Sequence, residues 1–225
     1  MTDHAHAAER AKTHTIYRLS DGTRVPGVTT ILGDTIPKPA LVQWANKLGL
    51  QGIETRKYVD ELATIGTLAH YLIECTLSNK EPDLKDYSPN QIALAYNSYR
   101  KFEEWVKKVD IEVIMSEQAS VSEVHRYGGT IDAYLIVDGR PTLLDIKTSK
   151  VCYPDHYTQI AAYALLIEED ITIPSPEVHK ILRVGRNEDE GFEEITIKNI
   201  NLHKERFLLC RALYDINRKV AKAIS

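Results

Sequence analysis

The sequence predicts a single domain of the α/β class, of the α+β type, in which a β-sheet is flanked by helices. Three observations indicate this class: apolar residues recur with helical spacing before residue 110, a hairpin pattern lies mid-chain, and strand and helix patterns alternate after it. A length of 225 residues suffices for one hydrophobic core. We expect one domain over residues 15–225, mainly helical over 15–110, with the sheet core and a closing helix over 111–225.

Residues 1–14 are polar and alanine-rich, and we expect a disordered leader there despite His4, His6 and His14. This leader has no hydrophobic stretch of the kind that signal peptides carry. No stretch of the chain approaches the apolar length needed to cross a membrane. The sequence therefore predicts a soluble, cytoplasmic protein with no membrane partner.

Charge and cysteine content exclude two classes of protein. The net charge of −4 does not suit a protein that coats nucleic acid, so any DNA contact requires a local basic patch. Cys75, Cys152 and Cys210 are odd in number and far apart, which fits neither a disulfide framework nor a zinc ribbon. We expect three reduced thiols.

The part before residue 110 is mainly helical. Tyr17–Val25 predicts a short hairpin, and three helices follow at 39–50, 54–77 and 89–109, the last capped by Ser88. The aromatic residues of the third helix could stack on bases, but helical core packing explains them more simply. They are Tyr96, Tyr99, Phe102 and Trp105.

A strand at 111–118 precedes the hairpin, which is the centre of the sequence. Two apolar runs, 130–137 and 142–146, flank Asp138-Gly139, a dipeptide that favours a type I′ turn. Pairing Val137 with Arg140 across this two-residue loop fixes every other pair. Asp132 then faces Asp145 at a non-hydrogen-bonded position, with Cβ atoms about 4.5–5.5 Å apart.

Two carboxylates this close repel by roughly 3 kcal/mol at an effective dielectric constant near 20. A bound cation would reverse the sign of that interaction. Because side chains alternate along a strand, Lys147 shares the face of Asp145, whereas Leu144 and Ile146 point into a core. A solvated strand face explains an Asp–Lys pair alone, but the opposed Asp132 favours a functional site.

The segment after the hairpin predicts a helix at 154–169, with His156, Gln159 and Tyr163 on one stripe beside the carboxylates. Two further strands follow at 178–184 and 192–197, and a closing helix at 202–223. We expect the inner side of that helix to carry Phe207, Cys210, Leu213 and Tyr214 or Asn217.

Four motifs occur together in this order. They are Gly66-Thr-Leu-Ala-His70, Gly129-Thr-Ile-Asp132, Asp145-Ile-Lys147-Thr-Ser149 and Gln159-Ile-Ala-Ala-Tyr163. The combination resembles the PD-(D/E)xK nuclease superfamily and, within it, the RecB-type exonucleases. The segments VPGVTTILG and PALVQWA are similar to the N-terminal part of small phage exonucleases and of the mitochondrial genome maintenance exonuclease. The resemblance implies a restriction-endonuclease-like core, a mixed central sheet flanked by helices, with an N-terminal helical elaboration.

Two departures from the superfamily pattern argue against a close match to type II restriction enzymes. Ile131 replaces the proline before the first acid, and the second acid, Asp145, is not a glutamate. Some RecB-type members carry an iron–sulfur cluster held by four cysteines. With three cysteines, this chain cannot build that cluster, and we expect none.

The residues and the resemblance together predict a site for Mg²⁺ or Mn²⁺. Asp132 and Asp145 supply hard oxygen ligands, the backbone carbonyl of Ile146 could add another, and the resemblance implies His70 and Glu117 as further ligands. Asp132, Asp145 and Lys147 are the predicted catalytic residues, with Lys147 orienting or deprotonating the attacking water. The predicted substrate-binding residues are Gln159, Tyr163, Thr67, Thr148 and Ser149.

The function that this site implies is a metal-dependent DNA exonuclease of phage or bacterial recombination or DNA processing, with DNA and a recombination protein as partners. A structure-specific endonuclease acting on flaps or junctions is an alternative on the same site. A catalytically inactive DNA-binding module is an alternative of another class. Cleavage polarity, strand preference and oligomeric state stay open.

Overall fold

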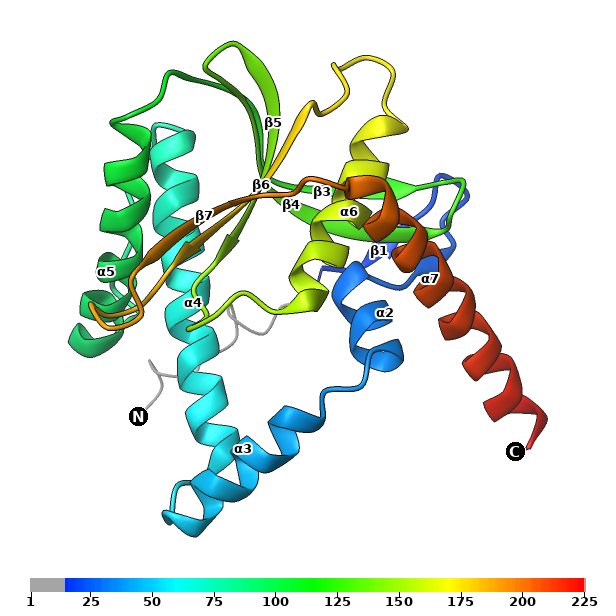
Figure 1. Ribbon diagram of the computed structural model, residues 1–225, viewed down its shortest axis with the longest axis horizontal. Helices are drawn as coiled ribbons and strands as arrows, with labels where there is room; N and C mark the ends of the chain where they lie inside the picture. Colours follow the sequence, from blue (N-terminus) through cyan, green and yellow to red (C-terminus); the bar gives the residue numbers. More distant parts are fainter. Residues whose placement is uncertain (1–14, 225) are drawn as a thin grey trace.

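The computed structural model describes residues 15–224 and contains a five-stranded mixed sheet with helices on both faces (Figure 1). The strands lie side by side in the order β3-β4-β5-β6-β7. The predicted α+β class with a mixed central sheet is confirmed. The strands are β3 (Ile111–Ser122), β4 (Tyr127–Val137), β5 (Arg140–Lys147), β6 (Val178–Val184) and β7 (Phe192–Thr196).

The β4–β5 hairpin has the predicted turn and register. Asp138 and Gly139 both have positive φ, 49° and 77°, as a type I′ turn requires. Val137 pairs with Arg140, and the pairing continues to Ala133 and Leu144. One further step in this register places Asp132 opposite Asp145.

Strand β5 pairs with β6 in parallel, and this pairing determines where α6 (Pro154–Glu168) lies. Parallel neighbours need a crossover connection, because the chain must return to the same end of the sheet. Helix α6 provides that crossover and packs on one face of the sheet (Figure 1). Six residues separate the end of β5 from the first turn of α6.

Helices α4 (Thr55–Leu77) and α5 (Pro89–Val106) cover the opposite face. Ile73, Phe102 and Trp105 pack there against the side chains of Leu144 and Ile146. Ser88 caps α5, its hydroxyl accepting from the Gln91 amide at 3.3 Å, as its position predicts. Packing, rather than base stacking, accounts for the aromatic residues of α5, because Phe102 and Trp105 are buried and Tyr96 and Tyr99 are partly buried against the core.

Helix α7 (Ile200–Ala223) packs beside α6 and buries Phe207, Cys210 and Tyr214. Leu213 is 44% exposed, so the prediction that it lies on the inner side is wrong. The buried stripe is narrow because the helix contacts the body along the 207-210-214 spacing, and Leu213 lies outside it. Asn217 is also exposed.

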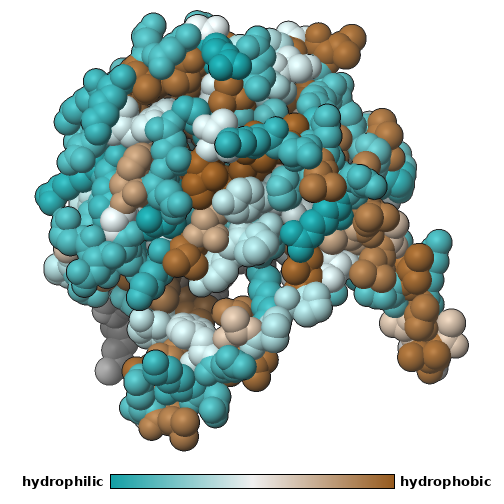
Figure 2. All heavy atoms as spheres, in the orientation of Figure 1, coloured by the Kyte–Doolittle hydropathy of each residue, from teal (hydrophilic) through white to brown (hydrophobic). Residues whose placement is uncertain are grey.

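The N-terminal elements are β1 (Tyr17–Arg18), β2 (Arg24–Val25), α2 (Val28–Thr35) and α3 (Pro39–Leu50). Helix α2 forms although Val, Thr and Ile are weak helix formers, because Val28, Ile31 and Leu32 are buried against α6 and α7. An ion pair of 2.6 Å between Lys38 and Asp155 ties the start of α3 to the start of α6. Helix α3 and the C-terminal half of α7 stand out from the body (Figure 2).

Several boundaries differ from the predicted ones by up to four residues. Helix α5 ends at Val106 instead of residue 109, β3 continues to Ser122 and β4 already begins at Tyr127. Cys75, Cys152 and Cys210 are unpaired thiols, as predicted. None of the helices within residues 15–224 combines the length and apolarity that crossing a bilayer requires. The predicted leader, residues 1–14, lies outside the described residues.

The N-terminal hairpin packs on β4 through a glycine. A Cβ atom on Gly128 would lie 2.2 Å from Cγ of Tyr17, whose hydroxyl is 3.0 Å from that of Thr130.

We therefore expect Gly128→Ala to lower the free energy of unfolding by about 1–3 kcal/mol, the usual cost of overpacking. Gly33→Ala is the matched control, since a Cβ there meets no atom within 4 Å. It should raise stability by about 0.5–1 kcal/mol. Urea unfolding of both variants measures this, and equal effects would contradict the packing described.

Candidate active site

Glu117 and Asp132 face each other on neighbouring strands. The pairs Ser116–Ala133 and Gln118–Ile131 flank them on β3 and β4. Glu117 has φ 45°, in the left-handed region that costs a residue with a side chain about 1–2 kcal/mol. Such strain in the middle of a strand persists only where the surroundings impose it, and it is concentrated at functional sites.

His70 completes a cluster with these two acids. Its Nδ1 atom lies 3.3 Å from Oε1 of Glu117 and 3.6 Å from Oδ1 of Asp132. One ligand atom from each of the three residues lies within 4.8 Å of the others. Helix α4 therefore brings the imidazole of His70 to the carboxylates of Glu117 and Asp132 on the sheet.

The second carboxylate oxygen of Asp132 has a different role. Its Oδ2 atom accepts a hydrogen bond of 2.7 Å from the backbone amide of Ile146. The β4–β5 pairing stops at Ala133 and Leu144, one residue earlier. The side chain of Asp132 thus takes the place of the next backbone contact and fixes its own orientation toward His70.

Asp145 lies beside this cluster and is fully buried. Lys147 is two residues further along β5, and its Nζ atom lies 2.8 and 2.7 Å from the two carboxylate oxygens. Burial raises the pKa of Asp145, and the charge of Asp132 adds to this rise, whereas Lys147 opposes it. Burial alone would lower the pKa of Lys147, but Asp145 and Asp132 raise it above the usual value.

The imidazole of His70 is protonated at neutral pH. Burial alone would lower its pKa, but the nearby carboxylates of Asp132 and Glu117 raise the pKa to about 9. Burial also raises the pKa of Asp132, although His70 and Lys147 counteract it. Two cations, each only partly exposed to solvent, therefore offset part of the charge of the three carboxylates of the site.

Gly66 allows α4 to come close to the end of β5. A Cβ atom on Gly66 would lie 2.9 Å from the hydroxyl of Thr148. An open cavity of about 370 Å³ lies at this contact, and His70 and Glu117 form part of its wall together with Thr67 and Thr148. The two predicted substrate-binding threonines thus lie beside the cluster, as their motifs suggest.

Gln159 and Tyr163 lie one helical turn apart on α6, and Nε2 of Gln159 donates to the Tyr163 hydroxyl at 2.8 Å. Burial, together with the charges of Asp145 and Asp132, raises the pKa of Tyr163 well above its usual value. A Cβ atom on Gly129 would lie 2.6 Å from the Tyr163 ring, so a glycine at this position leaves room for the ring. Burial, followed by the charge of Lys147, lowers the pKa of His156 on the same stripe to about 4.

Ser149 donates to the carbonyl of Val151 at 2.8 Å and does not belong to the cluster. Arg183 and Arg186 each form an ion pair with a glutamate, Glu193 and Glu190. The structure adds one residue that no local pattern signals. Tyr17 contacts Thr130 across 113 residues of sequence, and its hydroxyl contributes to the raised pKa of Tyr163.

The donor set of His70, Glu117 and Asp132 fits a divalent cation such as Mg²⁺ or Mn²⁺. Two hard carboxylates and one imidazole suit Mn²⁺ especially, because imidazole binds manganese better than magnesium. Asp145 lies close enough for the charge of Asp132 to raise its pKa. The residues present therefore can hold such an ion.

We expect Asp132→Asn to raise the melting temperature of the metal-free protein at neutral pH. The pKa of Asp132 is higher in the folded than in the unfolded chain, so its charge costs stability above that pKa and the cost disappears at lower pH. The variant should lose the gain in melting temperature that Mn²⁺ gives the wild-type protein. Glu112→Gln, on the same strand as Glu117 but outside the cluster, is the control. A lower melting temperature for metal-free Asp132→Asn would contradict this electrostatic account.

Comparisons with known proteins give a distant likeness in structure. No protein-family model matches the sequence, and no curated protein matches it. A candidate exonuclease from Eubacterium rectale aligns over 66% of this chain and 64% of its own length, less than two thirds, at 11% identity and a TM-score of 0.46. The protein SSO0001 aligns over 92% of this chain and 84% of its own, at 14% identity and a TM-score of 0.40.

Proposed function

We propose that this chain is a metal-dependent deoxyribonuclease that hydrolyses phosphodiester bonds from DNA ends. The observation that carries the proposal is the gathering of three carboxylates, His70 and Lys147 where β3, β4 and β5 meet. Carboxylates this close together, with Asp145 buried and Asp132 only 12% exposed, cost stability without a cation, so a function explains them better than folding does.

In this proposal His70, Glu117, Asp132 and Asp145 hold Mg²⁺ or Mn²⁺, with the backbone carbonyl of Ile146 as a further oxygen ligand. The ion supplies charge neutralisation and lowers the pKa of a bound water. Hydrolysis also requires a group that places the attacking water and a group that offsets the growing negative charge on phosphate.

Lys147 takes both of these roles in the proposal. Its ammonium group is fixed by Asp145 at the open end of β5, with 14% of its side chain exposed. Tyr163 and Gln159 present a hydroxyl and an amide beside the carboxylates and bind the phosphate backbone. Thr67 and Thr148, in the wall of the adjoining cavity, donate hydrogen bonds to phosphates of the same DNA strand.

The first experiment compares end-labelled linear DNA with covalently closed circular DNA, single-stranded and duplex, in Mn²⁺, Mg²⁺ or chelator. We expect metal-dependent loss of linear DNA alone. Cleavage of circles or of flaps and junctions would establish the structure-specific endonuclease instead. DNA binding without cleavage of any substrate would point to the inactive module and refute the proposal. Only the exonuclease result would support a role in phage or bacterial recombination.

Asp145→Ala and Lys147→Ala should each lower the cleavage rate by at least about 100-fold, because each removes a charge that acts on the transition state. Near-ultraviolet circular dichroism and urea unfolding check that both variants fold. Lys150→Ala is the control for Lys147→Ala, since Lys150 is exposed three residues further along. Full activity in Lys147→Ala would remove Lys147 from the mechanism.

Metal binding should also release a proton. His70 is protonated below its pKa of about 9, whereas a metal ligand must be neutral. We expect about one proton released per Mn²⁺ near neutral pH, falling toward zero as the pH rises above 9. Calorimetry in buffers of different ionisation enthalpy measures the number. The release should disappear in His70→Ala, and its persistence there would show that another group loses the proton.

A further inference from the structure

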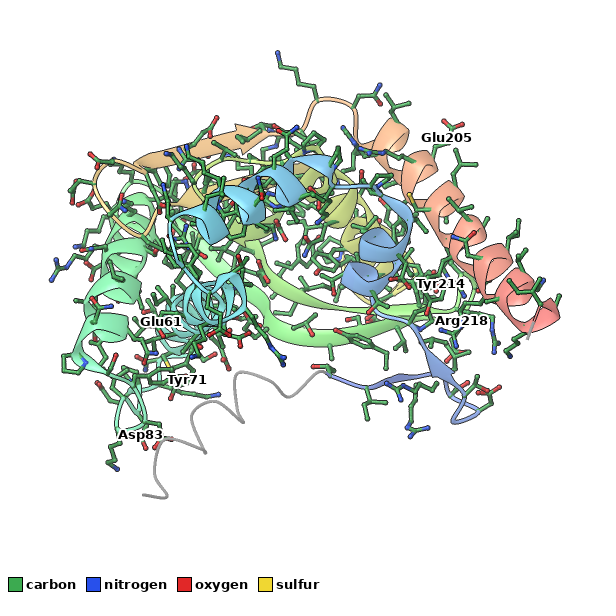
Figure 3. All side chains as sticks on the ribbon, turned by 90° about the horizontal axis from the view of Figure 1, so that it is seen from below. Glu61, Tyr71, Asp83, Glu205, Tyr214 and Arg218 are labelled. Atoms are coloured by element: carbon green, nitrogen blue, oxygen red, sulfur yellow. The ribbon has the colours of Figure 1, made fainter. Side chains whose placement is uncertain are left out.

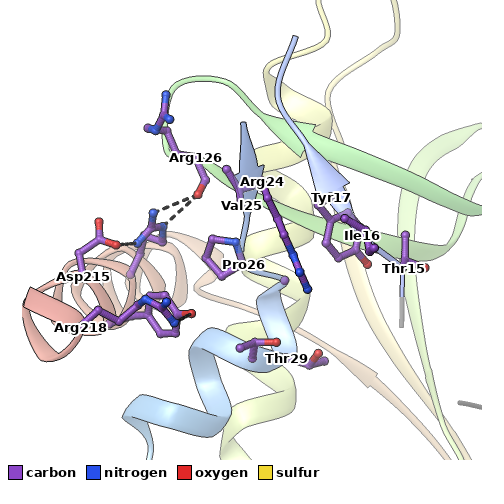
Figure 4. Close-up of a pocket in the computed structure, with 14 residues that line it drawn as sticks. Thr15, Ile16, Tyr17, Arg24, Val25, Pro26, Thr29, Arg126, Asp215 and Arg218 are labelled. Atoms are coloured by element: carbon purple, nitrogen blue, oxygen red, sulfur yellow. Dashed lines mark hydrogen bonds and ion pairs between the residues drawn. The ribbon is translucent and has the colours of Figure 1, made fainter. Parts of the chain in front are cut away.

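A second and larger cleft, of about 740 Å³, lies between the N-terminal hairpin, the start of α2 and α7 (Figure 4). Four arginines and one carboxylate line it, although the whole chain carries a net charge of −4. The cleft is therefore a local basic site of the kind that an acidic protein needs to hold a polyanion. The charged residues are Arg24, Arg126, Arg211, Arg218 and Asp215.

Arg211 and Asp215 have a structural role in the wall of the cleft. They form an ion pair of 2.5 Å, and Nη2 of Arg211 donates to the carbonyl of Arg126 at 3.0 Å (Figure 4). Arg211 thus fastens α7 to the β3–β4 turn, and the one carboxylate is already neutralised. The side chain of Arg126 points away from Arg24.

Arg24 and Arg218 are the available cations. No carboxylate lies within ion-pair distance of either one in the described part of the chain. The guanidinium carbon of Arg218 lies 5.6 Å from the centroid of the Tyr214 ring, on the side of α7 that faces α2 (Figure 3). Arg24 extends toward Thr29 (Figure 4), and Thr29 and Thr30 add two hydroxyls to the wall.

Tyr17, which lines the cleft, contacts the strand that carries Asp132. Its hydroxyl lies 3.0 Å from that of Thr130, which is two residues before Asp132 on the same face of β4. The Tyr17 hydroxyl also contributes to the raised pKa of Tyr163. At roughly 3.3 Å per residue, the five steps along β4 from Tyr127, the neighbour of Arg126 in the wall of the cleft, to Asp132 span about 17 Å. The far end of the cleft is thus remote from the metal ligands.

We propose that this cleft binds backbone phosphates of a DNA strand whose reacting bond lies at His70, Glu117 and Asp132. The proposal rests on the nuclease function and adds a site that binds the strand at a distance from the chemistry. Guanidinium groups recognise phosphate through paired hydrogen bonds, which suits Arg24 and Arg218.

The test measures binding of a long single-stranded oligonucleotide by fluorescence anisotropy in chelator, where no cleavage occurs. We compare the double variant Arg24→Gln/Arg218→Gln with the control Arg100→Gln/Lys219→Gln. Both remove two positive charges, but Arg100 and Lys219 are exposed and lie outside the cleft. The cleft variant should lose affinity several-fold. Its slope of log K against log salt should be shallower by about 1.4, because two phosphate contacts on a single strand, worth about 0.7 each, are lost.

Four further results separate the outcomes. A trinucleotide is too short to occupy both sites and should bind the wild-type protein more weakly than the long strand does; equal affinities would overturn the strand path. Equal affinity and slope for the long strand in both variants would overturn the cleft proposal even if the protein cleaves DNA. A loss confined to oligonucleotides with a terminal phosphate would also overturn it, since an end pocket and not a strand path would then be present. Cleft-dependent binding without metal-dependent cleavage would refute the nuclease function and leave the cleft as a DNA site.

Discussion

The structure depends on how three carboxylates are held together inside a protein. Glu117, Asp132 and Asp145 converge from three adjacent strands, and Asp145 is completely buried. Their mutual repulsion is tolerable because Lys147 and the protonated His70 lie against them. The positive charge on His70 stands where a divalent cation would act. The same electrostatic balance thus explains the stability of the metal-free chain and its suitability for metal.

The backbone around this cluster is arranged for the site rather than for regular pairing. The β4–β5 ladder ends at Ala133, and Asp132 then bonds the Ile146 amide through its side chain. On the other side, Glu117 takes up a left-handed conformation that a plain strand would avoid. Gly66 and Gly129 remove the side chains that would hold α4 and Tyr163 away from the strands. These local departures from regular pairing bring the three carboxylates, the imidazole of His70 and the ammonium group of Lys147 to one place.

Much of this could be predicted from the sequence where a local rule determines the result. The Asp138-Gly139 turn fixed the hairpin register, and alternation placed Lys147 beside Asp145. The rules failed where tertiary packing decides. Leu213 has the right spacing to be buried, yet the narrow contact of α7 leaves it exposed. The resemblance implied Glu117, but its left-handed backbone has no signal in the sequence. The contact of Tyr17 with Thr130, and with it the basic cleft, depends on segments far apart in the chain.

The position of His70 on a helix would couple metal binding to folding. The imidazole comes from α4 in the helical layer, whereas its partners belong to the sheet. An ion held by both parts would bridge two layers that otherwise meet through apolar side chains. Its binding energy would add to their docking and to the cooperativity of unfolding, because only the assembled layers bring all the ligands together. The resistance of α4 to proteolysis would then report on metal occupancy, and the candidate site would hold the helical layer and the sheet together.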